Sequence, residues 1–194
     1  MNIANLLTSL RIVLSPVFFV FAFLPLWGGS GFAPVSVVAL WVLFIIIELT
    51  DLFDGIAARA LGIVSDLGKL LDPFSDVVSR LTYFIVFTAF SIMPVWMFTL
   101  ILYREVGIIF VRMMMTREGI ALAARAGGKL KAVLYAVSTA LGLLMLTHVR
   151  LGIFHDLMPT LPWVVLGTFG AAVLVAWISF ADYLILVIRH FKNK

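Results

Sequence analysis

The sequence predicts an all-α integral membrane protein with six transmembrane helices, a short N-terminal interfacial helix and both termini in the cytoplasm. Its composition is the first reason: 63% of the 194 residues are hydrophobic and only 12% are charged, about half the charged fraction of a soluble domain. The second reason is a series of apolar runs, each long enough to cross a bilayer as a helix. The third is an uneven distribution of Lys and Arg along the chain. The length suits one membrane domain over residues 1–194.

The expected elements follow from the hydropathy pattern in chain order. Residues 1–11 place apolar side chains on one helical face and polar ones on the rest, as in a helix that lies at the membrane surface. Six spans are then expected at about residues 12–27, 33–50, 70–92, 94–115, 129–148 and 161–188, with turns at 60–69 and 116–127. An even number of spans places both termini on the same side of the membrane.

The positive charges indicate which side that is. If the N-terminus is cytoplasmic, the outer loops near residues 28–32, 91–94 and 149–160 contain one of the 14 Lys and Arg residues, Arg150, and the other thirteen lie on the cytoplasmic side. This is the positive-inside bias of membrane proteins. The net charge of +4 therefore indicates contact with a membrane surface and not with nucleic acid. The absence of cysteine excludes a disulfide framework and thiol catalysis.

Four carboxylates interrupt this apolar sequence in two pairs. Asp51 and Asp54 are three residues apart, and Asp72 and Asp76 are four apart, so each pair shares one face of a helix. Four ionised carboxylates cannot stay together near a membrane unless their charge is neutralised. One or two divalent cations would do this, and oxygen-only ligands favour Mg²⁺, Mn²⁺ or Ca²⁺ over Zn²⁺. The alternative is a pair of solvated acidic helix ends.

Small residues at fixed offsets argue against that alternative, because a solvated surface does not require them. Gly55 and Ala58 leave room for a bulky ligand beside the second carboxylate, and Gly68 allows the two helices to approach. Arg59 adds a planar cation suited to phosphate. The stretch therefore predicts a metal site that also accommodates a phosphorylated ligand.

From Asp51 to Asp76 the residues read D-x2-D-G-x2-A-R-x8-G-x3-D-x3-D. This pattern resembles the signature of the CDP-alcohol phosphotransferases, integral membrane enzymes of phospholipid synthesis. The resemblance implies that two divalent ions, Mg²⁺ or Mn²⁺, are held by Asp51, Asp54, Asp72 and Asp76. It also implies that Asp76 takes the proton of the acceptor hydroxyl as the catalytic base.

The same resemblance assigns the nucleotide. Its positions for the CDP moiety correspond here to Gly55, Arg59, Ser65 and Gly68. It further implies that the protein forms a homodimer. The implied binding partners are CDP-diacylglycerol, a small phosphorylated alcohol and membrane lipids. With the charge bias described above, the active site is expected to face the cytoplasm from the inner membrane.

Ionisable residues also occur in and beside the fourth and fifth expected spans. They are Arg104, Glu105, Arg112, Arg125, Lys129 and Lys131. Such residues usually face a bundle interior or a wet cavity. One interpretation is a buried Arg–Glu pair beside an ordinary basic loop. The other is an anionic-substrate site formed by Arg104, Arg112, Arg125 and Lys129.

The spacing of these residues resembles the spacing found in the phosphatidylglycerophosphate synthase branch of the family. In that branch, basic residues of the corresponding helices bind the phosphate of the acceptor. The implied donor is CDP-diacylglycerol, the acceptor sn-glycerol 3-phosphate, and the products phosphatidylglycerol phosphate and CMP. Asn5, Thr8 and Arg11 resemble the opening of the same branch, although Ala4 stands where that pattern has Pro. Val77 stands where the branch often has Lys.

That departure leaves other acceptors open, among them serine, inositol phosphate or another alcohol, and Arg80 is a candidate to replace the missing Lys. A different class of protein, a transporter or cation channel with an acidic filter, is the second hypothesis. Transporters are often built from repeated halves with broken helices, and no internal repeat occurs in this sequence. Glu48, one turn before the first carboxylate, is not assigned to the metal.

Overall fold

A computed structural model of the chain describes residues 3–61, 66–120 and 126–192, and side chains over 6–53, 71–120 and 127–192. Within these residues the fold is all-helical. The long helices are α1 (Ile3–Gly28), α2 (Ala33–Leu61), α3 (Asp66–Ala89), α4 (Val95–Arg117), α5 (Ala126–Leu151) and α6 (Leu161–Lys192), with short 3₁₀ helices η1 (Ser30–Phe32) and η2 (His155–Leu157). The prediction of an all-α protein is confirmed.

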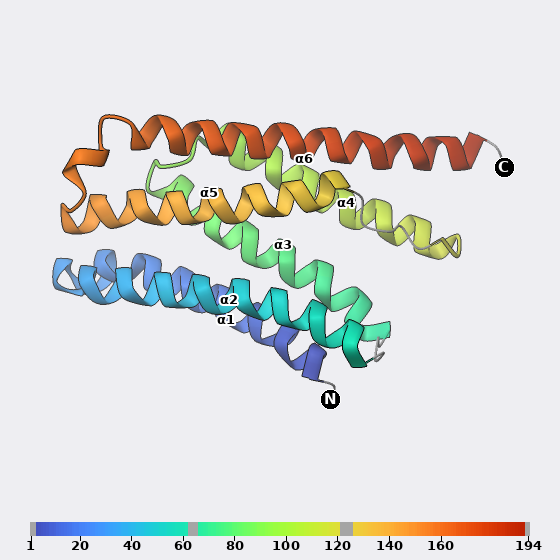
Figure 1. Ribbon diagram of the computed structural model, residues 1–194, viewed down its shortest axis with the longest axis horizontal. Coiled ribbons are helices and arrows are strands. Elements are labelled where there is room, and N and C mark those ends of the chain that lie inside the picture. Colours follow the sequence, from blue (N-terminus) through green and yellow to red (C-terminus); the bar gives the residue numbers. More distant parts are fainter. Residues whose placement is uncertain (1–2, 62–65, 121–125, 193–194) are drawn as a thin grey trace.

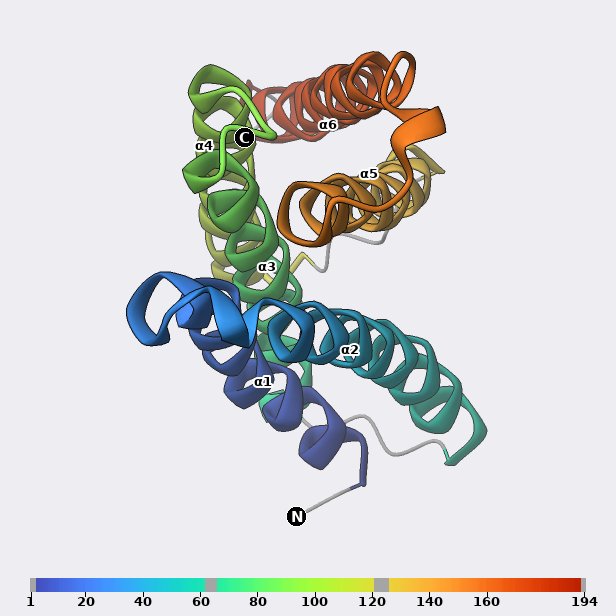
Figure 2. The ribbon, with the colours of Figure 1, turned by 90° about the vertical axis from the view of Figure 1, so that its left-hand side faces the viewer.

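The helices form two groups that α3 joins. Helix α1 packs against α2 and α3, and α6 packs against α5 and α4. Helix α3 runs obliquely between the α1/α2 pair and the α5/α6 pair (Figure 1) and also contacts α4 and α5. The view along the bundle shows these two pairs on opposite sides, with α3 and α4 connecting them (Figure 2).

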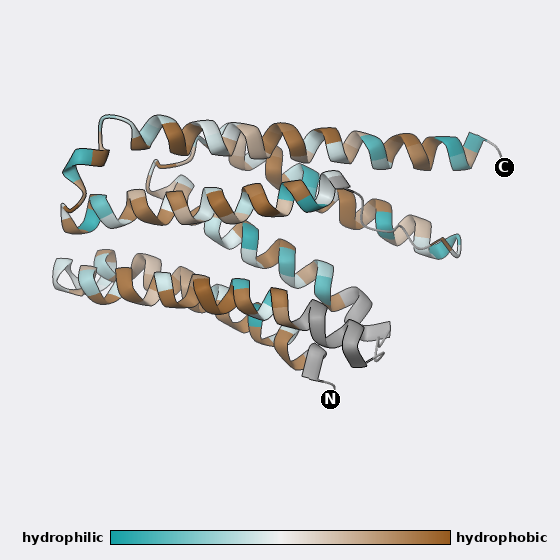
Figure 3. Ribbon diagram, viewed as in Figure 1, coloured by the Kyte–Doolittle hydropathy of each residue, from teal (hydrophilic) through white to brown (hydrophobic). Residues whose placement is uncertain are grey.

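Four helices are long and apolar enough to cross a membrane: α1, α2, α5 and α6, through the segments Leu6–Gly28, Ser30–Phe53, Gly127–Leu151 and Leu161–Lys192. Hydrophobic residues follow these helices over most of their length (Figure 3). Helices α3 and α4 are of similar length, 24 and 23 residues, but carry more ionisable side chains. Their lower hydropathy separates them from the other four, although some of their polar side chains, such as Ser79 of α3 and Arg104 and Glu105 of α4, are buried in the bundle.

The expected interfacial helix at residues 1–11 does not exist as a separate element. Helix α1 is continuous from Ile3 to Gly28 and passes through Pro16 and Pro25. Its polar side chains Thr8, Arg11 and Ser15 are all buried. The amphipathic pattern was therefore interpreted wrongly: the polar stripe faces the other helices and not the membrane surface. The turn expected at 60–69 is also shorter, because α2 extends to Leu61 and α3 begins at Asp66.

Aromatic side chains fill the region where α3 meets the α5/α6 pair. Phe84 lies edge-on to Tyr135 of α5 and Phe169 of α6, with ring centroids 5.1 and 5.7 Å apart. All three rings are fully buried. Edge-to-face packing of this kind stabilises a core beyond the burial of area alone, so these contacts fix the second half of α3 against α5 and α6.

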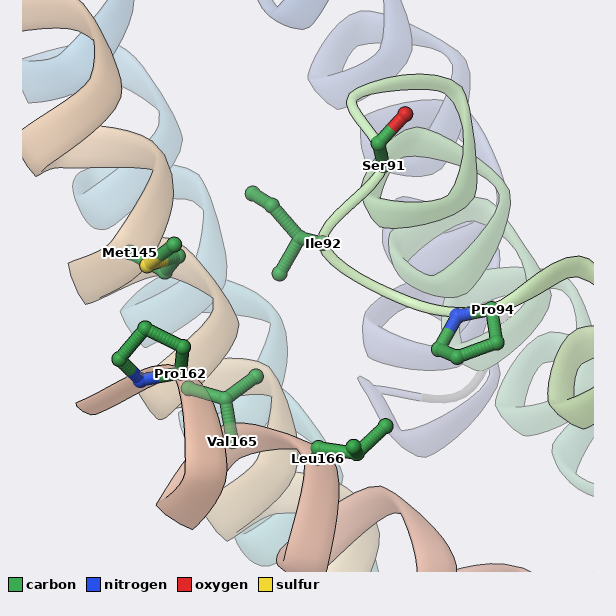
Figure 4. A pocket seen from close by; sticks show the side chains of 7 residues that line it. All are labelled: Ser91, Ile92, Pro94, Met145, Pro162, Val165 and Leu166. Carbon is green, nitrogen blue, oxygen red and sulfur yellow. The ribbon is translucent and has the colours of Figure 1, made fainter. Parts of the chain in front are cut away.

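The end of the bundle opposite the carboxylates is closed by Arg150. This α5 side chain donates hydrogen bonds to the Ser36 hydroxyl and to the Ala22 carbonyl, and it lies over the Phe90 ring. A cavity of about 210 Å³ lies nearby, lined by Ser91, Ile92, Pro94, Met145, Pro162, Val165 and Leu166 (Figure 4). Its lining follows the end of α3, whereas two of the carboxylates lie near that helix's beginning, so the cavity is separate from the acidic residues.

Close packing of α3 on α5 predicts a specific steric effect. A Cβ atom at Gly142 would lie 2.8 Å from Cε2 of the buried Phe87 ring, whereas one at Gly167 has no atom within 4 Å. We expect Gly142→Ala to lower the free energy of unfolding by about 1–3 kcal/mol. The matched control, Gly167→Ala, should be neutral or stabilising by up to about 1 kcal/mol. Unfolding in detergent measures both, and equal effects would contradict the packing described here.

Candidate active site

Three of the four predicted carboxylates meet at one end of the bundle. Asp51 comes from α2, and Asp72 and Asp76 come from successive turns of α3. One oxygen from each lies within 4.8 Å of the others. Their side chains are 37%, 53% and 46% exposed, respectively, so a soluble ligand can reach them. Asp54 lies on α2, but its side chain is outside the part of the chain for which side chains are described.

Arg11 of α1 lies beneath this cluster. Its Nη1 donates to Oδ1 of Asp51 and of Asp76, each at 2.5 Å, and its Nη2 donates to Oδ1 of Asp72 at 2.7 Å. The guanidinium is only 1% exposed. Helix α1 packs against both α2 and α3, which explains how one side chain reaches carboxylates from two helices.

Sequence analysis did not assign Arg11 to the site, although it noted the residue in the N-terminal pattern. The signal was the spacing of Thr8, Arg11 and Ser15, which lie three and four residues apart and therefore share a helical face. A buried polar stripe on an otherwise apolar helix indicates partners inside the protein. The interpretation of residues 1–11 as an interfacial helix concealed this.

A second polar layer lies one turn deeper in the bundle. The Ser15 and Ser79 hydroxyls are 3.0 Å apart, and both guanidinium nitrogens Nη1 and Nη2 of Arg80 donate to the Glu48 carboxylate. The Tyr83 hydroxyl is buried and has no hydrogen-bond partner among the described residues. Arg80 was a candidate to replace the missing Lys. Its guanidinium instead donates to Glu48, so these two residues pair with each other and not with the carboxylate cluster.

The positions assigned to CDP lie on the same two helices. Gly55 and Arg59 are in the last turns of α2, and Gly68 is in the first turn of α3. Their side-chain surroundings are outside the described part, and Ser65 lies outside the described residues altogether. The nucleotide assignment therefore stays a prediction.

The ionisable residues of α4 and α5 form a buried network around Glu105. Its Oε1 atom accepts hydrogen bonds from Arg104 Nη1 at 2.9 Å, Lys131 Nζ at 2.8 Å and the Tyr135 hydroxyl at 2.9 Å. Arg104 also donates through Nε to the Ala176 carbonyl of α6 at 3.2 Å. The network thus links α4, α5 and α6, as expected from the interpretation of a buried Arg–Glu pair.

The other predicted acceptor residues lie outside this network. Arg112 is half-buried, and its Nε atom has no hydrogen-bond partner among the described residues. Lys129 is exposed near the start of α5, and Arg125 lies outside the described residues. Lys131, by contrast, belongs to the Glu105 network through its hydrogen bond to Glu105. The cations that remain available to a ligand in the described part include Arg112 and Lys129.

Comparison with known proteins identifies the class. Residues 1–180 match the family described as CDP-alcohol phosphatidyltransferase. The match covers almost the whole chain, including the three clustered carboxylates and the helices that position them. The chain belongs to the CDP-alcohol phosphatidyltransferase family.

Several relatives share about a third of their residues with this chain. A CDP-diacylglycerol--glycerol-3-phosphate 3-phosphatidyltransferase of Treponema pallidum is 36% identical over 75% of this chain and 69% of its own length. A "Probable phosphatidylglycerophosphate synthase" of Mycobacterium tuberculosis is 34% identical over 97% of this chain and 82% of its own. A Bacillus subtilis protein with the same name as the first is 36% identical over 72% and 76%.

The Glu105 network predicts a loss of stability when its carboxylate is neutralised. Glu105→Gln leaves two buried cations without a counter-charge, so the free energy of unfolding should fall by about 3–5 kcal/mol. Glu118→Gln is a suitable control, because Glu118 lies near the surface and 3.9 Å from His190, where an ion pair contributes about 0–1 kcal/mol. Thermal unfolding in detergent gives both values. A Glu105 variant as stable as the control would contradict the structural role.

Proposed function

We propose that this protein transfers the phosphatidyl group of CDP-diacylglycerol to sn-glycerol 3-phosphate, forming phosphatidylglycerol phosphate and CMP in phospholipid biosynthesis. One observation carries the proposal: Asp51, Asp72 and Asp76 of the family signature meet at one exposed end of the bundle. The names of the relatives from Treponema pallidum and Bacillus subtilis support the donor and the acceptor.

The donor set fits a divalent cation, because it consists of carboxylate oxygens close enough to share one ion. We propose Mg²⁺ or Mn²⁺, two per site, held by Asp51, Asp54, Asp72 and Asp76. When bound, such ions neutralise charge on a pyrophosphate and orient it for displacement. The partial exposure of three of these carboxylates supports entry of both ions and substrates from the aqueous side.

In the proposed reaction the acceptor hydroxyl oxygen forms a bond to the phosphorus that carries the diacylglycerol, and the bond from that phosphorus to CMP breaks. Asp76 takes the hydroxyl proton. Such a reaction depends mainly on positioning and on neutralising charge. Arg59 would bind phosphate oxygens of CDP, and Gly55, Ser65 and Gly68 would accommodate the nucleotide. The acyl chains would stay in the bilayer beside the exposed apolar faces of the helices.

We propose that all six long helices of the single domain cross the inner membrane, with both termini and the active site at the cytoplasmic side. Helix α1 begins, and α6 ends, toward the same side of the bundle as the end of α2 and the beginning of α3 (Figure 1), which supports this topology. Glu105 of α4 pairs with Arg104 of the same helix and with Lys131 of α5, so these charges of the span have partners within the bundle. A homodimer is the proposed assembly.

For the acceptor phosphate we propose Arg112, Arg125 and Lys129, with Arg104 placed behind them in the Glu105 network. The half-buried guanidinium of Arg112, with its unpartnered Nε atom, supports an anionic ligand, because an uncompensated cation in such surroundings is costly. A zwitterionic acceptor such as serine would not require these cations. Arg104 would then not contact the acceptor itself but would help to hold α4, and Arg112 on it, in position through its bonds to Glu105 and Ala176.

The decisive assay gives purified protein CDP-diacylglycerol together with glycerol 3-phosphate, serine or inositol phosphate, and measures CMP release and the lipid product. We expect phosphatidylglycerol phosphate in the presence of Mg²⁺ or Mn²⁺ and none in excess EDTA. Asp76→Asn should bind CDP-diacylglycerol but lose turnover by roughly 10²-fold or more, as befits a general base. Preference for another acceptor would overturn the substrate assignment, and full turnover in EDTA would overturn the metal assignment.

Kinetics with both substrates varied separate the acceptor site from the donor site. Arg112→Gln or Lys129→Gln should raise KM for glycerol 3-phosphate by roughly tenfold or more, because each removes a charge-assisted contact worth about 1.5–3 kcal/mol. The KM for CDP-diacylglycerol should change much less. Arg117→Gln, at the end of α4, is the control and should leave both values near those of the wild type. Equal losses for donor and acceptor would assign Arg112 and Lys129 a structural role.

A further inference from the structure

We propose that Arg11 is a built-in counter-ion of the carboxylate cluster and that it weakens the binding of divalent cations there. The inference rests on the proposed metal site but assigns a role to a residue outside it. Arg11 donates to the carboxylates, and we assign it the role of a positioning residue. The observation behind it is that one guanidinium donates to three of the carboxylates at once.

The guanidinium and the carboxylates differ sharply in exposure. Arg11 is 1% exposed, whereas Asp51, Asp72 and Asp76 are between 37% and 53% exposed. Arg11 therefore holds the carboxylates from the protein side, through one oxygen of each, and a soluble cation would approach from the opposite, open side. Because its donors bridge α2 and α3, Arg11 keeps the carboxylates together by means of a charge that the chain itself supplies.

A fixed positive charge at this position has two opposing effects on a metal ion. It gathers the carboxylates in advance, which favours binding, and it repels a second cation a few ångströms away, which disfavours binding. Because the guanidinium is buried on the protein side of the cluster, water screens its charge poorly from an ion held by the same carboxylates, and the repulsion is the larger effect. Arg11 thus sets an upper limit on metal affinity and makes the cluster stable when no metal is bound.

No other described cation is arranged to take over this role. Arg80 lies one turn from Asp76, but both of its terminal nitrogens donate to Glu48. Lys131 is hydrogen-bonded to Glu105. Removal of the Arg11 charge therefore leaves the three carboxylates to repel one another until a metal ion compensates them.

The test measures Mn²⁺ binding to purified protein in detergent without substrates, by titration calorimetry or by the electron paramagnetic resonance signal of free Mn²⁺. We expect Arg11→Gln to bind Mn²⁺ at least about tenfold more tightly than the wild type. Arg11→Lys keeps the charge but cannot reach three carboxylates with a compact ammonium group, so its affinity should increase by only a few-fold. Unchanged or weaker binding in both variants would overturn the inference.

Thermal unfolding with and without saturating Mn²⁺ supplies a second measurement. Arg11→Gln should lose stability mainly in metal-free buffer and regain most of it with Mn²⁺. The matched control is Arg150→Gln, which removes another inter-helix arginine of the same bundle, at its opposite end. That variant should lose the same amount with and without metal. If Arg11→Gln behaves like Arg150→Gln, or folds in neither condition while Arg11→Lys binds Mn²⁺ like the wild type, Arg11 is only structural.

The same titrations separate this inference from the proposed metal site. Asp51→Asn should weaken Mn²⁺ binding in either case if the carboxylates hold the ion. A wild-type protein that binds no Mn²⁺ would refute the metal site itself, and the Arg11 inference with it. A wild type that binds Mn²⁺, and loses it in Asp51→Asn but shows no gain in Arg11→Gln, would refute the Arg11 inference alone.

Discussion

Neutralisation of like charge inside an apolar helix bundle is the constraint on which this structure depends. Three carboxylates approach within 4.8 Å, and the buried Arg11 guanidinium donates to all of them. Helix α1 lies against both α2 and α3, and this packing brings a cation beneath carboxylates from the other two helices. The packing of α1 against α2 and α3 therefore also determines the geometry of the site.

The same constraint recurs along the chain. Glu105 joins α4 to α5 by accepting from Arg104, Lys131 and Tyr135, and Glu48 joins α2 to α3 by accepting from Arg80. In a bundle whose outer surface is apolar, each ionisable group needs a partner in the interior. The pairs therefore specify which helices are neighbours, whereas the aromatic core around Phe84 mainly provides close packing. In a soluble protein, water would satisfy many of these groups and would leave the arrangement less determined.

Much of the fold followed from local pattern. Six long helices and their approximate ends are encoded in apolar runs separated by Gly, Pro and polar turns, which depend on neighbours close in sequence. The error at residues 1–11 shows the limit of that reasoning. An amphipathic helix with Thr8 and Arg11 on one face has the same pattern whether that face meets water or buried carboxylates. The membrane character of α3 and α4 is ambiguous for the same reason, because hydropathy counts a paired charge as if it were exposed.

By itself, the sequence determined that Asp51 pairs with Asp54 and Asp72 with Asp76 on helical faces, because those relations span one turn of a regular helix. It also determined the family, through a signature contained in 26 residues. Only the tertiary structure decided which cation from another helix meets which carboxylate: Arg11 with the cluster, Arg80 with Glu48, and Lys131 with Glu105. Those partners are between 26 and 65 residues apart. Their choice depends on how the helices pack, which no local pattern of residues contains.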